Sequence, residues 1–415
     1  LIKFFKFGLI LLFYQSPLYS KSKTLSNFNS HHLSNYFSGI VAYDNNDNSQ
    51  ALKFFKLSKH LIKQYNPYLE NYIHALVLEG NVQEAASEIK QNLTKSNSNF
   101  FEAYLVLALE SIKKKDYKKS KDHIQKALKF IDNNKFDKII LETLKQYLYV
   151  FEEKEIPSIK NKFGDLSLIN GVFQRCYLGD KNTQSYFENL INNKDNIKNK
   201  GADYSRYIFF YLSYLTEHNR YDEAKKLVGS LSYLDSSLLV SQGKKWIEDQ
   251  KTEEFKKIFS CSNSNDVIAE FFFLVANLYS SQNDYKKSNF YLNISQYLNP
   301  KFKFNLSLLA ENYLFNKDYL KTSKILKSIN KKDEFYYWFR LKKKAQIISI
   351  EQNDNKSLEF INSNFKKIKN PSVKIVFDIA NLNKNAKKYK DAIKYYDQII
   401  LKIDTDSQLY SETLY

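Results

Sequence analysis

Recurring aspartates are the first residues in this 415-residue chain with the potential for chemistry. They follow lysine- or asparagine-rich turns in successive segments, at Asp116, Asp222, Asp284, Asp318 and Asp354. Catalytic carboxylates must meet in one site, whereas these occupy equivalent places in separate segments. An aspartate in such a place begins a helix or forms a turn, because its side chain accepts hydrogen bonds from nearby backbone. We therefore assign these residues to helix starts and not to catalysis.

Histidine and cysteine supply the other candidates. The pair His31-His32 could hold a metal ion, but no third ligand accompanies it at helical spacing, and we interpret it as a surface pair. We expect His74 to serve packing on a helix. Cys176 and Cys261 lie 85 positions apart. Five intervening helices packed about 8–10 Å apart would separate the thiols by about 20 Å, too far for a disulfide, so we expect two free thiols.

Motifs of common catalytic and cofactor sites are missing from the sequence. There is no His-Glu-x-x-His, no Cys-x-x-Cys pair, no glycine-rich phosphate loop and no Gly-x-Ser-x-Gly. Nine glycines in the whole chain leave little material for a nucleotide cradle. We predict no active site, no cofactor and no metal site, and hence a protein that is not an enzyme.

Two consecutive segments, Phe271–Leu298 and Leu306–Ile329, are near copies of each other. Each has apolar residues at spacings of three and four, then a polar turn, then a second stripe of the same kind, which is typical of two antiparallel helices. Ser288 and Thr322 occupy the same place in the two copies, 34 positions apart. A period of this length indicates a helical repeat array. Small residues at that place allow the two helices to approach closely.

The pattern of one unit resembles the tetratricopeptide repeat. Its order of aromatic, small and large apolar residues falls at Phe272, Ala276, Tyr279, Asp284-Tyr285, Ser288, Leu292, Ser295 and Pro300. The small-residue marker recurs at Ala51, Ala85, Ser120, Ala224, Ser288, Thr322, Ser357 and Ala392. The resemblance covers residues ~34 to 415 unevenly. It implies an all-α fold, a right-handed α-solenoid of stacked antiparallel helix pairs with about eleven units, some degenerate.

The repeats divide the chain into predicted regions. Residues 34–135 and 201–406 carry repeats of this type, 136–200 carry degenerate helical repeats, and 407–415 begin a further repeat. That last segment lacks a partner helix, and the chain contains no methionine. We therefore expect an incomplete gene product.

The N-terminus differs in kind from the repeats. Lys3 and Lys6 precede an apolar run over residues 7–14, and a small residue precedes a possible cut after Ser20, as in a secretory signal. The run is shorter than the ~20 residues of a spanning helix. We expect residues 1–20 to be a signal peptide or N-terminal anchor, followed by a polar linker over 21–33. The expected location is exported, periplasmic or envelope-associated in a bacterium; the alternatives are an inner-membrane anchor at residues 7–14 and a merely apolar terminus.

The net charge of +18 could attract anionic partners. Only four of the 63 basic residues are arginine, the residue that makes the commonest base contacts, so we disfavour nucleic acid. A solvated lysine-rich surface is the simplest interpretation, and an acidic partner or an anionic envelope surface is the alternative.

The resemblance also implies a binding surface, because first helices of such repeats line a concave groove. Carried over unit by unit, the groove residues are Arg206, Phe209, Ser213, Phe273, Asn277, Ser307, Glu311, Lys342, Gln346, Phe377 and Asn381. Lys342 with Gln346 comes nearest to the carboxylate clamp of one subset of the family, but Asp378 stands where that clamp needs Asn, so we reject a clamp.

The function that follows is a scaffold that binds partner proteins or peptides along this groove. Two other hypotheses stay open. The repeats could recruit substrates for a catalytic domain beyond residue 415, which the complete reading frame would reveal. The lysines could instead bind anionic glycan or lipid, in which case salt would abolish binding.

Overall fold

The computed structural model describes residues 30–65, 67–92, 100–131, 135–158, 163–192, 204–231, 236–403 and 408–414. Every regular element in these ranges is helical. The predicted all-α solenoid of stacked helix pairs is confirmed. The predicted signal peptide or anchor and most of the polar linker lie outside the described residues. The first helix within the described residues begins at Ser30, four residues before the predicted start of the repeats.

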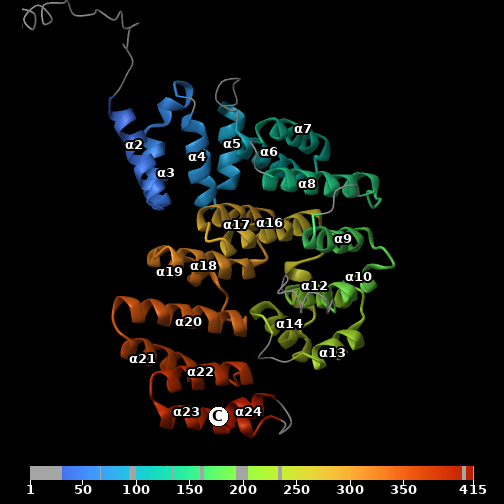
Figure 1. The fold of residues 1–415 in the computed structure, drawn as a ribbon, viewed down its shortest axis with the longest axis vertical. Helices are drawn as coiled ribbons and strands as arrows, with labels where there is room; N and C mark the ends of the chain where they lie inside the picture. Colours follow the sequence, from blue (N-terminus) through green and yellow to red (C-terminus); the bar gives the residue numbers. More distant parts are fainter. Residues whose placement is uncertain are drawn as a thin grey trace, which may run out of the picture.

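The helices follow one another as hairpins (Figure 1). The first part of the chain contains α2 (Ser30–Asp44), α3 (Asn48–Leu57), α4 (Pro67–Leu78), α5 (Val82–Asn92), α6 (Phe101–Lys113), α7 (Tyr117–Ala127) and α8 (Lys135–Glu153). The middle contains α9 (Asp165–Leu178), α10 (Thr183–Ile191), α12 (Arg206–Glu217), α13 (Tyr221–Gly229), α14 (Leu238–Glu248) and α15 (Glu253–Ile258). The last part contains α16 (Ser264–Ser281), α17 (Tyr285–Leu298), α18 (Leu306–Phe315), α19 (Tyr319–Ser328), α20 (Glu334–Glu351), α21 (Asp354–Phe365), α22 (Val373–Asn385), α23 (Tyr389–Ile400) and α24 (Gln408–Leu414).

The turn inside a hairpin has one recurring backbone structure. At the α16–α17 turn, Asn283 adopts a left-handed conformation with φ of 62°, and Asp284 N–H donates to Tyr279 O at 3.0 Å. This bond and Asn283 N–H to Ser280 O satisfy the last carbonyls of α16, as in a Schellman motif. The same pair of bonds recurs at the α6–α7 and α18–α19 turns.

The aspartate of this turn begins the second helix, as predicted for three of the five. The side chains of Asp116, Asp284 and Asp318 each accept a hydrogen bond from the backbone N–H three residues on. At the α20–α21 turn the neighbouring Asn353 makes this bond in place of Asp354. Asp222 lies inside the first turn of α13, where its negative charge interacts favourably with the positive end of the helix dipole.

Close approach between paired helices explains the small residues of the repeat marker. Ser288 and Thr322 are fully buried. At Gly39 in α2, a Cβ atom would lie 2.7 Å from the Phe55 ring of α3, which leaves no room for a side chain. Ser357 departs from the pattern, because it is half-buried and donates to Ala345 O at 2.7 Å.

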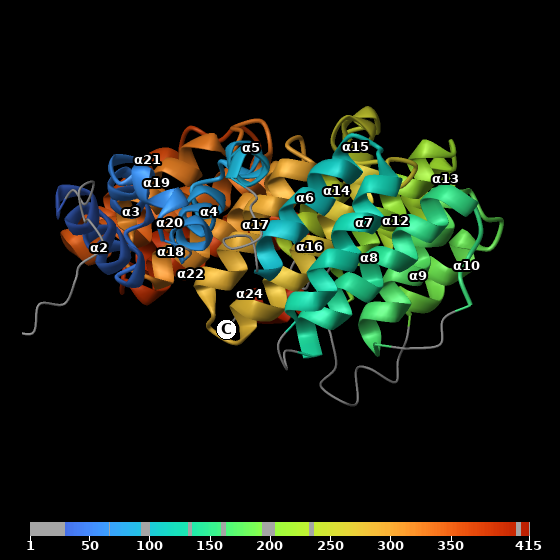
Figure 2. The same ribbon diagram turned by 90° about the horizontal axis from the view of Figure 1, so that it is seen from above.

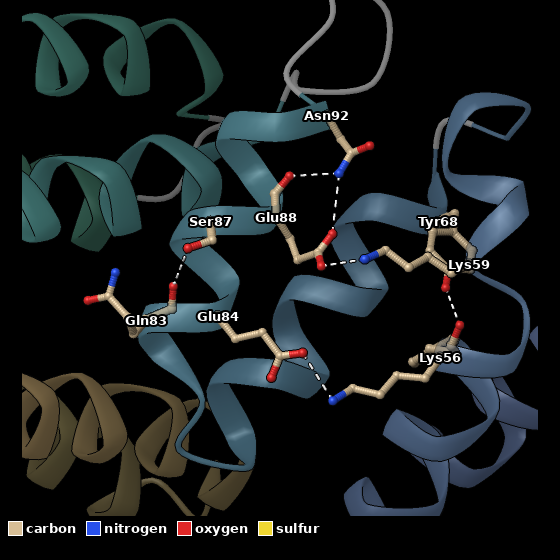
Figure 3. Close-up of polar contacts among 9 residues, drawn as sticks. Lys56, Lys59, Tyr68, Gln83, Glu84, Ser87, Glu88 and Asn92 are labelled. Carbon is tan, nitrogen blue, oxygen red and sulfur yellow. Dashed lines mark hydrogen bonds and ion pairs between the residues drawn. The ribbon is translucent and has the colours of Figure 1, made fainter.

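Polar contacts link neighbouring units along the second helices. Figure 3 shows Lys56 of α3 paired with Glu84 of α5 at 3.0 Å, and Lys59 paired with Glu88. Asn92 donates to the same Glu88 carboxylate at 3.3 Å. The Lys56–Glu84 pair is exposed, and such pairs contribute little, about 0–1 kcal/mol. Glu88 is buried at 7% exposure, so Lys59 and Asn92 supply partners to a carboxylate that would otherwise be costly to bury.

The array coils back upon itself. Helices α9 to α15 lead away from α8 and return, so that α16 and α17 cross beneath α4, α5 and α6 (Figures 1 and 2). At this seam Asn293 of α17 donates to Leu78 O at 3.1 Å, and Lys286 donates to Tyr43 O at 2.8 Å. Lys321 of α19 pairs with Glu79. The first units therefore pack against units more than 200 residues later.

The return of the chain corrects the prediction of two free thiols. Cys176 in α9 and Cys261, just before α16, form a disulfide with 5.7 Å between their Cα atoms. The estimate of a 20 Å separation assumed that each helix adds distance along a straight stack. Because α10 to α15 curl round and α16 packs on α9, the two cysteines meet instead.

Within the ranges that the structure describes, none of the helices combines the length and apolar character needed to cross a bilayer.

Candidate functional site: a groove along the first helices

Two adjoining cavities lie where the returning chain faces its last units. The first has a volume of about 490 Å³ and the second about 330 Å³, and both contact Leu238 and Ser307. We call these two cavities together the groove. Its walls come from α16, α18, α20 and α22 on one side, and from α9, α12 and α14 on the other.

The first cavity is mainly apolar. Aliphatic side chains from three helices line it, namely Leu166, Ile169, Leu238, Leu239, Leu274 and Leu278. Leu278 is 42% exposed, so a partner could reach and cover its side chain. The cavity therefore suits a bulky apolar side chain of a ligand.

Arg206 forms the polar end of the first cavity. Its Nε and Nη2 donate to the two carboxylate oxygens of Glu270 at 2.7 and 2.8 Å, and Nη2 also donates to Asn305 Oδ1 at 2.8 Å. The guanidinium carbon lies 3.7 Å from the centre of the Phe273 ring. This forked geometry holds the arginine in one orientation at the cavity wall.

Burial sets the electrostatics of this pair. Removal of the Glu270 carboxyl from water raises its pKa, and the Arg206 guanidinium opposes that shift. A bidentate ion pair satisfies both charges, so the pair presents little net charge to the cavity.

The second cavity carries a denser set of charges. Lys342 and Trp338 both donate to Asp378 Oδ2, at 2.6 and 2.9 Å. Lys343 pairs with Glu311 at 2.8 Å. Lys374 lines the same cavity and donates to Ser236 O at 2.7 Å. Most charges here have a partner within the protein, so a ligand would meet neutral pairs and aromatic rings.

Six of the predicted groove residues line the groove. They are Arg206, Phe273, Asn277 and Ser307 in the first cavity, and Glu311 and Lys342, with Ser307 again, in the second. Gln346 is exposed one turn beyond Lys342. Phe377 contacts the Tyr396 ring edge-on, and Asn381 accepts the Tyr396 hydroxyl hydrogen at 2.5 Å, so both extend the same row of helices beyond the two cavities.

The predictions for Phe209 and Ser213 are wrong. Phe209 is 0% exposed and Ser213 is 2% exposed. Phe209 packs against Trp246 and Phe255, and a Cβ atom at Gly243 would lie 2.9 Å from its ring. Helix α12 lies inside the curled middle part, so the face expected to look into a groove is covered by α14 and α15.

Apart from Arg206, the residues of the second wall of the groove were not predicted. Its residues belong to α9 and to the starts of α12 and α14, where the repeat pattern is weak. Leu166 and Leu238 read as ordinary apolar residues in the sequence. Their place at a cavity follows from the return of the chain, for which no local motif exists.

The chain matches no protein-family model and no curated protein. Its fold is similar to the crystal structure of yeast Tom70, with a TM-score of 0.28 and 11% identity over 92% of this chain and 87% of that chain. A second match is the TPR domain of P58(IPK), with a TM-score of 0.26 and 11% identity over 92% and 96%. The recurring hairpin turns and the packing of successive helix pairs define the helix-pair solenoid.

Proposed function

We propose that this protein is a scaffold that binds extended segments of partner proteins in the groove. The observation that carries the proposal is the apolar first cavity beside the charge-paired second cavity, both set on first helices. An extended segment with a bulky apolar residue in the first cavity and polar residues along the second would match this lining.

We further propose that the groove binds without catalysing a reaction. The charged groups of its lining support this: Arg206 is engaged by Glu270, Lys342 by Asp378 and Lys343 by Glu311. Charged groups that are already engaged by partners within the protein favour a recognition surface.

Export is part of the same proposal. Disulfides persist in oxidising compartments such as the bacterial periplasm, and the Cys176–Cys261 bond supports such a location. The basic and apolar pattern of residues 1–20 is that of an export signal. We propose an exported, periplasmic or envelope-associated protein of a bacterium, and an anchor at residues 7–14 would place it at the inner membrane.

The test uses peptides selected from a displayed random library on the full chain, with affinities measured by fluorescence polarisation. Leu278→Asp should weaken binding at least tenfold, because it places a carboxylate in the apolar cavity. Leu320→Asp is the matched control: Leu320 is 89% exposed on α19 and lies outside the groove, so affinity should be unchanged.

Two results would overturn the proposal. One is that Leu278→Asp and Leu320→Asp reduce the affinity equally, or that neither variant reduces it. The other is binding that disappears in high salt for every selected peptide, since only interactions between exposed charges are screened so strongly. That result would favour the lysine-rich surface as the binding region.

A further inference from the structure

Away from the groove, three side chains with metal-ligand chemistry converge near the seam of the coiled array. Glu70 and His74 are four residues apart on α4 and therefore share one face of that helix. Glu102 belongs to the first turn of α6, the first helix of the next unit. One ligand atom from each residue lies within 4.8 Å of the other two.

The His74 ring is held in place by two neighbours. Its Nδ1 lies 3.2 Å from the Tyr43 hydroxyl oxygen, and the Phe290 ring of α17 packs at 5.4 Å between centroids. When Nδ1–H donates to Tyr43, the lone pair of Nε2 faces the carboxylates. Metal-bound histidines commonly have their second nitrogen oriented in this way.

The Nε2 atom of His74 is buried and makes no hydrogen bond among the described residues. Glu102 Oε1 is 3.6 Å from it, which is too long for a hydrogen bond. Among the same residues, no lysine or arginine nitrogen lies within 4.0 Å of the Glu70 or Glu102 carboxylate. Three electron-pair donors therefore face one another, and the nearest positive charges belong to other groups.

The lysines near this cluster have their own partners. Lys286 donates to Tyr43 O at 2.8 Å, and Lys287 lies 3.9 Å from Asp284. Lys287 nevertheless acts on Glu102 at longer range. These charges weaken cation binding without filling the cluster, so we expect modest affinity.

We propose that Glu70, His74 and Glu102 bind one Zn²⁺ ion, with water completing its coordination. A set of one imidazole and two carboxylates suits zinc, and Mn²⁺ is the nearest competitor for such ligands. The ion would link α4 to α6 across two neighbouring units. The simpler alternative is a protonated His74 paired with Glu102, which would need no ion.

Isothermal titration of the full, metal-free chain with zinc chloride tests the proposal. We expect one equivalent to bind. Glu70→Gln should weaken binding at least tenfold without changing the melting temperature of the metal-free protein, because Glu70 is exposed. Tyr43→Phe should weaken it about 10- to 100-fold, the usual effect of losing a residue that orients a ligand. Co²⁺ should give a visible absorption band that His74→Gln abolishes.

The chain also supplies a matched control. The His32 ring of α2 and the His60 ring of the 3₁₀ helix Lys59–Lys63, which follows α3, have centroids 4.8 Å apart, and such a pair could bind zinc adventitiously. The His32→Gln/His60→Gln variant should bind as the unmodified chain does. No binding at 1 mM zinc, or binding lost in this control and retained in Glu70→Gln, would overturn the proposal.

Discussion

At the residue scale, the hairpin turn is the best-determined feature of this molecule. Its left-handed residue and the following aspartate were both visible in the sequence as Asn-Asp or Lys-Asp pairs. The cap bond is local, because the backbone N–H of Lys287 donates to the Asp284 carboxylate three residues earlier, at 3.1 Å. Distant packing therefore does not change it. This is why the helix starts at Asp116, Asp284 and Asp318 were predictable from the sequence.

The cap makes a quantitative prediction. Asp284→Ala should lower the free energy of unfolding by about 1 kcal/mol, because the N–H of Lys287 loses its acceptor. Asp222→Ala removes an exposed aspartate from the first turn of α13, where no cap bond exists, and should cost less, about 0.3–1 kcal/mol. Thermal unfolding of the two variants distinguishes them. A larger loss for Asp222→Ala would contradict the assignment of the caps.

A buried carboxyl makes stability depend on pH. Burial raises the pKa of Asp266 to about 6, although its carboxylate accepts the Ser260 N–H at 3.0 Å. The unfolded chain ionises this group near its ordinary pKa of about 3.9. The contribution to stability is therefore complete below about pH 4 and is lost as the pH rises through 6.

Asp266→Asn should remove this loss. Relative to the unmodified chain, the variant should gain about 1–2 kcal/mol between pH 4 and pH 7, less than the full linkage value because solvent partly screens the site. Denaturant unfolding at both pH values measures it, with the exposed Asp222→Asn as control. A stability difference that does not change with pH would contradict the expected titration of Asp266.

At the element scale, the pairing of helices was predictable and the placement of pairs was not. In the regular units, small residues such as Ser288 mark close contacts within a hairpin. The face that a hairpin presents to the rest of the molecule depends on how later helices return. That is why Phe273 lines the first cavity while Phe209, an aromatic residue at a similar place in its unit, is covered by α14 and α15.

The disulfide is the element-scale feature that the sequence concealed, and it predicts a clear chemical result. Thiol titration of the unreduced protein in denaturant should find no free thiol, and reduction should release two. Cys176→Ser should lower stability by about 4–5 kcal/mol, because the bond closes a loop of 85 residues. Two free thiols in protein purified without reductant would contradict the pairing.

At the scale of the whole molecule, the coil closes through contacts that sequence patterns do not record. Asn293 donates to the backbone carbonyl of Leu78, and Lys286 donates to that of Tyr43. Every residue has a backbone carbonyl, so the sequence does not indicate which carbonyl accepts such a bond. The periodicity of a repeat array predicts how each unit packs on its neighbours. It does not predict which distant units come into contact.

Reversal of a charge at the seam should open the coil. Lys321→Glu would place a second carboxylate beside that of Glu79, at a position where both side chains are largely buried. Small-angle X-ray scattering should show a larger radius of gyration with unchanged helical circular dichroism. Lys327→Glu, an exposed change on the same helix, should leave the radius unchanged. An equal increase in both variants would argue against the seam.

The most direct test of the central claim, that the groove holds partner segments, is site-specific photocrosslinking in cells that produce the protein. A photoreactive phenylalanine analogue at Asn277, which lines the first cavity, should crosslink to one or a few proteins. The same analogue at Lys118, exposed on the second helix α7, should not. Identical crosslinks from both positions, or none from Asn277 while Lys118 captures partners, would contradict the account.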